Sequence, residues 1–253
     1  MSLLSHLMLL PPSRGVREGG DASVTWKDTP LADGGVGAAR KRVVAAARKL
    51  RRDDLADAIG GASAVPDARR MLDEVHRSPT MPAVERYAGV VYDHLDVASM
   101  PAAARRRAHR HVMIPSALFG PLLGGDPIPA YRLLMLARLP DPVGRLASFW
   151  RPHVAARLDE VLAENATVVD LLSSEYAAAV PAAARKGRHW VTVDFVDDRG
   201  KKVPGTIGKQ RKGTLARALL TAGAATPDAA DTMADGTLVE ATDDRWVLQV
   251  ETP

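Results

Sequence analysis

Short apolar segments alternate with helix-like segments through the second half of this 253-residue chain. Residues 111–120, 166–172 and 189–198 have the length and the apolar or alternating pattern of strands. Residues 149–164 and 208–223 carry apolar side chains at helical spacing. Strands that alternate with helices are typical of α/β proteins, in which helices cover a central sheet. We therefore predict an α/β fold.

Both ends of the chain contain strand signals as well. The run "LMLL" (7–10) predicts a buried first strand that Pro11 and Pro12 end. Residues 236–253 predict a hairpin with its turn at residues 243–244. Residues 130–139 are compatible with a strand or a helix by periodicity alone.

Residues 38–108 are expected to be mostly helical. The spacing predicts a helix over 38–52, a second that Asp53 or Asp54 caps and that ends at Ile59, a third over 66–75, and helical pieces over 83–108. The corner at 53–72 has the outline of a helix-hairpin-helix, which binds phosphates through the N–H groups of its turn. That motif separates two glycines by one residue, whereas Gly60 and Gly61 are adjacent, so an ordinary helical corner is the preferred interpretation.

Familiar catalytic and metal-binding patterns are missing from the sequence. The chain has no cysteine, which excludes disulfide-linked partners, thiolate nucleophiles and cysteine-based metal sites. Its histidines lack metal-ligand spacing, and His109 and His111 lie among arginines that repel cations. A P-loop and a nucleophile elbow are absent as well. We therefore predict no metal and no cofactor. No apolar run reaches membrane-spanning length, so a cytoplasmic protein without a membrane partner is expected.

Basic residues are clustered although the net charge is only +4. The clusters lie at 39–52, 105–111 and 199–217. Such runs suit phosphate-bearing partners, either nucleic acid or nucleotide. A solvated helix face is an equally good interpretation of any single run.

The stretch "DLLSSEYAAAV" (170–180) gathers Ser173, Ser174, Glu175 and Tyr176 where a buried strand should end. One interpretation is a helix cap, in which Ser173 or Ser174 accepts a hydrogen bond from a backbone N–H and Glu175 is favoured in the first turn. The other is the wall of a binding crevice, because open α/β sheets place ligands at strand ends.

Several segments together resemble the YaaA family of peroxide-stress-response proteins, in its actinobacterial form. In order, they are "LLPPSRG" (9–15), "RYAGVVYDHLD" (86–96), "PSALFGPLLGGDPIPAYRLLM" (115–135), "FWRPHV" (149–154) and "VVDLLSSEYAAAVP" (168–181). The basic segment "GKQRKGTLARALL" (208–220) is similar to the family's late K-x-x-K-G pattern. The resemblance covers nearly the whole chain.

The resemblance implies a single compact α/β domain over residues 1–253. Its central mixed sheet is surrounded by helices, with a hairpin at the C-terminus and a helical insertion at about 38–108. The resemblance also implies binding of double-stranded DNA through a positively charged cleft and a helix-hairpin-helix-like element at 53–72. The associated role is to limit oxidative DNA damage during peroxide stress.

Polar groups of the matching segments are expected to meet at strand ends. The residues predicted to bind DNA or another anionic ligand are Ser13, Tyr87, Ser116, Arg132, Ser174, Lys209, Arg211, Lys212 and Arg217. If the protein is an enzyme, Glu175 is the candidate general acid or base, and Tyr131 or Tyr176 is the candidate proton donor.

Three departures from the family pattern distinguish this chain. Arg14, Gly15 and Val16 follow Ser13 where Glu-Gly-Lys is usual, Ala88 replaces a lysine, and Gly205 and Thr206 stand where Ser-His is common. The loss of polar groups from one cleft suggests a diverged paralogue. The alternative function is therefore an enzyme that acts on a nucleotide, a nucleoside or another small anionic metabolite.

Overall fold

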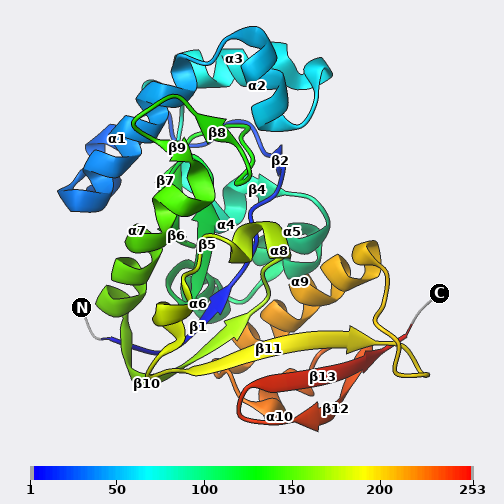
Figure 1. Cartoon of the computed structure of the whole chain (residues 1–253). Helices are drawn as coiled ribbons and strands as arrows, with labels where there is room; N and C mark the ends of the chain where they lie inside the picture. Colours follow the sequence, from blue (N-terminus) through cyan, green and yellow to red (C-terminus); the bar gives the residue numbers. More distant parts are fainter. Residues whose placement is uncertain (1–2, 252–253) are drawn as a thin grey trace.

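A computed structural model of the chain describes residues 3–251 and contains a seven-stranded sheet flanked by helices (Figure 1). The strand order is β12-β13-β11-β10-β1-β5-β6. The strands are β1 (Leu4–Leu9), β5 (Val112–Ser116), β6 (Gly120–Leu123), β10 (Leu162–Asp170), β11 (His189–Val196), β12 (Gly236–Ala241) and β13 (Arg245–Val250). The five inner strands are parallel, whereas β6 and β12 run antiparallel at the two edges. The predicted α/β fold with a mixed sheet and a C-terminal hairpin is confirmed; residues 252–253 of that hairpin lie outside the described residues.

The crossover from β1 to β5 contains the predicted helical region. Its helices are α1 (Gly34–Arg48), α2 (Arg52–Ile59), α3 (Val65–Glu74), α4 (Ala83–Arg86), α5 (Val90–Leu95) and α6 (Ala102–His111), with 3-10 turns η1 (Trp26–Asp28), η2 (Pro30–Ala32), η3 (Ala62–Ala64) and η4 (Val97–Ser99). The later helices are α7 (Leu146–Val161), α8 (Ser174–Ala177), η5 (Ala182–Arg185), α9 (Gly205–Ala222) and α10 (Pro227–Ala230). Paired two-residue strands complete the fold: β2 (Gly15–Val16) with β4 (Tyr87–Ala88), β3 (Met81–Pro82) with β7 (Pro127–Ile128), and β8 (Arg138–Leu139) with β9 (Gly144–Arg145). None of the helices within residues 3–251 is long and apolar enough to cross a membrane.

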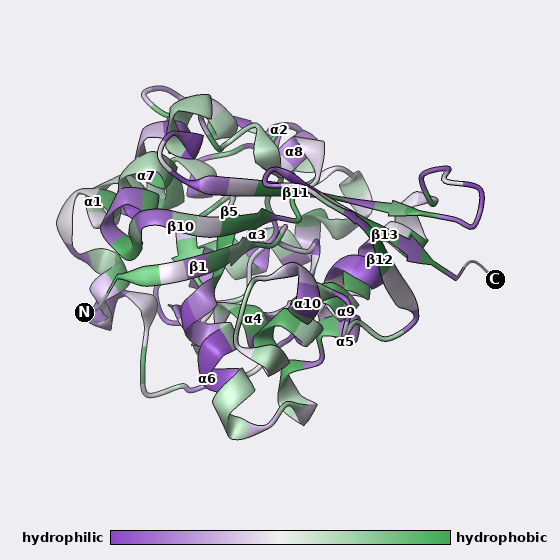
Figure 2. Cartoon of the chain, turned by 90° about the horizontal axis from the view of Figure 1, so that it is seen from below, coloured by the Kyte–Doolittle hydropathy of each residue, from purple (hydrophilic) through white to green (hydrophobic). Residues whose placement is uncertain are grey.

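One buried apolar cluster joins the sheet to its helices. β5 is buried at all five positions, as a strand in the middle of an α/β sheet should be. Figure 2 shows the contrast with α6, which is largely hydrophilic and buries only Ala104 and Ala108. Because the cluster runs through both halves of the chain, the molecule folds as a single compact domain.

Two buried arginines stabilise the crossover through hydrogen bonds to backbone carbonyls. Arg40 donates to the carbonyls of Leu31, Phe119 and Pro121, at 2.7–3.0 Å. Arg86 is fully buried and donates to four carbonyls, which lie in three segments of the chain. Each guanidinium therefore supplies hydrogen-bond donors to backbone carbonyls in these segments.

The predicted cap of the second helix is wrong. α2 begins at Arg52, and the extended residue before it is Arg51, whose side chain makes no cap hydrogen bond. Asp53 and Asp54 lie within the first turn, where their charge still favours the positive end of the helix. The predicted stop is confirmed, because Gly60 ends α2 with a φ of 78°.

Residues 130–137 form neither of the two elements that their periodicity allows. Leu133, Met135 and Ala137 are buried in alternation, as they would be in a strand. The hydrogen-bond partners of the backbone, however, come from different parts of the chain. Leu134 N–H donates to the Ala58 carbonyl, and Met135 N–H donates to the Glu175 carboxylate. The segment is therefore a buried loop that links the α2–α3 corner to α8.

Candidate functional site

The carboxyl ends of β1 and β10 define the candidate site. These parallel strands are neighbours, and Leu9 pairs with Asp170 at their ends (Figure 1). Within the sheet, β5 lies on one side of β1 and β10 lies on the other. The chain therefore leaves β1 towards one neighbour and later returns to form the other. Open α/β sheets bind ligands at strand ends where the connections diverge in this way.

A cavity of about 600 Å³, named here the strand-end hollow, lies at this point. Residues 11–14 after β1 and residues 89–92 at the start of α5 line it. Ser173, Glu175 and Tyr176 line it from the segment after β10, and Lys209 and Lys212 line it from α9. Its volume is that of a typical small-ligand pocket.

The two lysines of α9 differ in their surroundings. Lys209 is exposed, whereas Lys212 is half-buried and its Nζ donates to the Leu172 carbonyl at 3.0 Å. Burial lowers the pKa of Lys212, and the charge of Lys209 lowers it further, against an opposing effect of Asp170. Lys209 is thus a solvated cation, and Lys212 is an amine that gives up its proton more readily than an exposed lysine.

A second cavity of about 180 Å³, named here the corner hollow, adjoins the first. The turn between α2 and α3 contributes Gly60, Gly61 and Ser63, and the buried loop contributes Arg132. Ser13 and Arg14 line both hollows. The helix-hairpin-helix-like corner therefore faces the same cleft as the two lysines.

The predicted cap at Ser173, Ser174 and Glu175 is confirmed in position but not in its hydrogen bond: Glu175 lies in the first turn of α8, as predicted. Ser173 is the N-cap residue of α8, but its side chain makes no cap hydrogen bond. Glu175 Oε1 instead accepts from Met135 N–H at 3.2 Å, so the carboxylate ties the wall of the hollow to the buried loop. Ser174 is exposed at the start of α8, and Ser173 lines the hollow in its place.

Three predicted residues form a buried hydrogen-bond chain behind the cleft. The Tyr131 hydroxyl lies 2.8 Å from the Tyr87 hydroxyl and 2.7 Å from Ser116 Oγ, which accepts from Phe119 N–H. Burial raises the pKa of both tyrosines, so both phenols stay protonated. Tyr131 lines the corner hollow, while Tyr87 and Ser116 are wholly buried. Tyr176 lines the strand-end hollow, and burial raises its pKa as well.

Two predicted cations of α9 point away from both hollows. Arg211 pairs with Asp235 at 3.3 Å and donates to the Glu251 carbonyl. Arg217 donates to the carbonyls of Leu95 and Asp96 and to Ser99 Oγ. Of the predicted cations, the structure brings together Arg132, Lys209 and Lys212.

Arg14 is the residue that the sequence-based prediction missed. It is exposed and lines both hollows, yet in the sequence it registers only as the loss of a family glutamate. The sequence did contain a signal for Arg14 as a site residue. It directly follows Ser13, in a segment that comes after a predicted strand. Two departures also meet in space, because Gly15 pairs with Ala88 and Val16 pairs with Tyr87.

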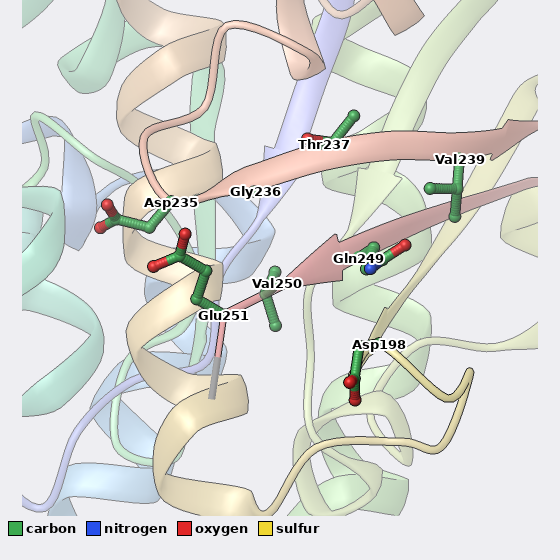
Figure 3. A pocket seen from close by; sticks show the side chains of 8 residues that line it. All are labelled: Asp198, Asp235, Gly236, Thr237, Val239, Gln249, Val250 and Glu251. Atoms are coloured by element: carbon green, nitrogen blue, oxygen red, sulfur yellow. The ribbon is translucent and has the colours of Figure 1, made fainter. Parts of the chain in front are cut away.

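A third hollow lies at the β12 edge of the sheet, on β12 and β13 (Figure 3). Asp198, Asp235 and Glu251 give it an acidic character. Within residues 3–251, no group of three or more His, Cys, Asp or Glu side chains is arranged to hold a metal ion. An acidic surface repels phosphates, so this hollow is not a candidate phosphate-binding site.

Comparison with known proteins shows similarity along most of the chain. The family model described as peroxide stress protein YaaA matches residues 7–238. A UPF0246 protein of Streptomyces coelicolor is 35% identical over 222 residues, which cover 87% of this chain and 84% of the relative. A UPF0246 protein of Corynebacterium glutamicum is 33% identical over 217 residues, 84% of each chain. A relative from a Ruegeria species is 36% identical over 142 residues, 54% of this chain and 57% of its own.

Proposed function

Because this chain belongs to the family of the peroxide stress protein YaaA, we propose that its two joined hollows bind the phosphate backbone of double-stranded DNA during peroxide stress. The observation that carries the proposal is that Arg14 lines both hollows. We therefore treat the two hollows as one continuous cationic cleft. A DNA partner also places the protein in the cytoplasm.

The charge of the cleft supports a polyanionic partner. Its lining contains four cations, Arg14, Arg132, Lys209 and Lys212, and among the lining residues that the structure describes Glu175 is the one acid. Phosphate contacts from arginine and lysine supply most of the affinity of sequence-independent DNA binding. The α2–α3 corner adds backbone N–H groups at a helix start, which suit a phosphate oxygen.

Removal of Arg14 and Lys209 is expected to weaken duplex binding about tenfold at moderate salt and to reduce the salt slope by about two, because two phosphate contacts are lost. Fluorescence anisotropy with a labelled duplex over a salt series measures both quantities. The matched control is the double variant Arg105→Ala, Lys186→Ala, which removes the same charge from exposed positions outside the hollows. Equal losses in the two double variants, or an affinity of the wild type that does not change with salt, would contradict the proposal.

A second candidate function is catalysis on a small phosphate-bearing metabolite, such as a nucleotide or nucleoside phosphate. The volume of the strand-end hollow favours it, since about 600 Å³ is enough to hold a small ligand. Glu175 is then the general acid or base, Tyr176 is a proton donor, and Arg14 and Lys209 hold the phosphate.

Glu175→Gln separates the two functions. Glutamine keeps an oxygen that can accept from Met135 N–H, so the melting temperature should stay close to that of the wild type. Duplex affinity should persist or rise, because one negative charge leaves the cleft. An amide cannot exchange the proton that acid–base catalysis requires, so turnover of any substrate found in a thermal-shift screen should fall roughly 10²–10⁴-fold. Unchanged turnover would exclude a catalytic role for Glu175, and a large drop in melting temperature would make the residue structural.

A further inference from the structure

Lys212 occupies an unusual position for a phosphate-binding lysine. Its side chain is half-buried in the wall of the strand-end hollow, and its Nζ donates to the neutral carbonyl of Leu172. Within residues 3–251 no carboxylate forms an ion pair with it. Asp170, the acid whose charge opposes the lowering of the Lys212 pKa, already accepts from Leu172 N–H at 3.0 Å and from Trp190 Nε1 at 3.1 Å.

These surroundings make Lys212 easier to deprotonate than an exposed lysine. Burial and the neighbouring charge of Lys209 both lower the pKa of Lys212. A lysine that serves only to bind phosphate gains from staying protonated, and the exposed Arg14 and Lys209 of the same hollow meet that need. A desolvated lysine near other cations is instead the usual form of a nucleophilic amine.

We propose that Lys212 Nζ forms a Schiff base with an aldehyde of a phosphate-bearing ligand held in the strand-end hollow. The nitrogen lone pair adds to the carbonyl carbon, and proton transfer gives a carbinolamine. Loss of water from the carbinolamine leaves a C=N bond between the ligand and Nζ. The exposed cations Arg14 and Lys209 hold the phosphate, and the half-buried amine reacts with the carbonyl.

Two sources supply this ligand chemistry. One is the ring-opened deoxyribose of an abasic site in duplex DNA, which carries an aldehyde between two phosphates; this source rests on the proposed DNA-binding function. The other is a free sugar phosphate in its aldehyde form, which fits the volume of the hollow without a duplex.

Reductive trapping tests the proposal. The wild-type protein is incubated with cyanoborohydride and, in separate arms, a duplex with one abasic site, the same duplex intact, and deoxyribose 5-phosphate. Peptide mapping by mass spectrometry then locates the adduct. We expect a reduced adduct in at least one aldehyde arm, none with the intact duplex, and several-fold more modification at Lys212 than at any other lysine, because burial lowers the pKa of its amine. The arm that reacts identifies the source.

Lys212→Arg keeps the positive charge but cannot condense with an aldehyde, so it should lose the adduct, whereas Lys186→Arg, at an exposed position outside the hollow, should retain it. No adduct in either aldehyde arm, modification spread over surface lysines, or an adduct that persists in Lys212→Arg would overturn the inference. Mapping on the wild type decides the question even if Lys212→Arg folds poorly. Anisotropy with the intact duplex tests the proposed function separately. If the protein binds the duplex but no adduct forms, only the Schiff base is rejected. If an adduct forms with the sugar phosphate but the duplex does not bind, only the DNA function is rejected.

Discussion

Gly213→Val is expected to destabilise the protein by about 3 kcal/mol or more, because it places a side chain where another helix already lies. A Cβ atom at Gly213 would lie 2.2 Å from the Val91 carbonyl oxygen and 2.9 Å from Leu95 N, both backbone atoms of α5. Helix α9 would have to move away from α5 and would take Lys212 out of its contact with Leu172. Urea unfolding measures the loss of stability, and anisotropy with duplex DNA measures the effect on the cleft.

Gly208→Ala is the matched control for that experiment. It lies in the same helix, but the nearest atom to an added Cβ is the Val203 Cγ2 at 3.9 Å. Alanine has the higher helix propensity, so this variant should be stabilised by about 0.5–1 kcal/mol. If Gly213→Val were as stable as the wild type, the close contact between α5 and α9 would not exist in solution.

Arg86→Met should cost about 3–5 kcal/mol, since it leaves buried carbonyl groups without a donor. Nε donates to the Ile128 carbonyl at 3.1 Å, and the other two nitrogens bind the carbonyls of Arg17, Gly19 and Pro79. Methionine fills much of the volume but donates nothing, so the loss measures the hydrogen bonds rather than the packing. The measurement is the free energy of unfolding in urea.

Arg106→Met provides the control for charge and composition, because Arg106 is exposed on α6 and its loss should change stability by less than about 0.5 kcal/mol. Similar stabilities of the two variants would show that, in Arg86→Met, the carbonyls around position 86 accept hydrogen bonds from water. Arg86 also holds residues 17–19, which follow the β2 segment at the edge of the cleft, so its replacement should weaken ligand binding as well.

The regular elements were accessible from sequence because their signals are local. Alternating apolar residues predicted the strand at 189–196 and the final hairpin, and the helical spacing predicted the C-terminal ends of α2 and α9. The buried loop at 130–137 was not accessible, because its backbone groups bond to Ala58 and Glu175, far away in the chain. Nothing in the local sequence indicates such partners.

The same distinction applies to the site. Lys209 and Lys212 were identified because they share one helix and a family pattern, and they do face the cleft. Arg211 and Arg217 lie in the same basic run, yet side chains on one helix point in different directions, and acidic or carbonyl partners on other elements hold both of them. Which member of a charged run faces a ligand is decided by tertiary contacts.

The central position of β1 has a consequence for synthesis on the ribosome. Residues 7–10 are almost wholly buried, but the neighbours that cover the strand are Val112 and Met113 on one side and residues 167–170 on the other. At typical translation speeds, about 10–30 seconds separate the appearance of β1 from that of its second neighbour. Until residues 112–113 are made this apolar strand has neither neighbour, and until residues 167–170 are made it has only one, so we expect the nascent chain to bind chaperones. β1, which leads into one wall of the cleft, is thus made first. Its pairing in the sheet is complete only after β10, which leads into another wall, has left the ribosome.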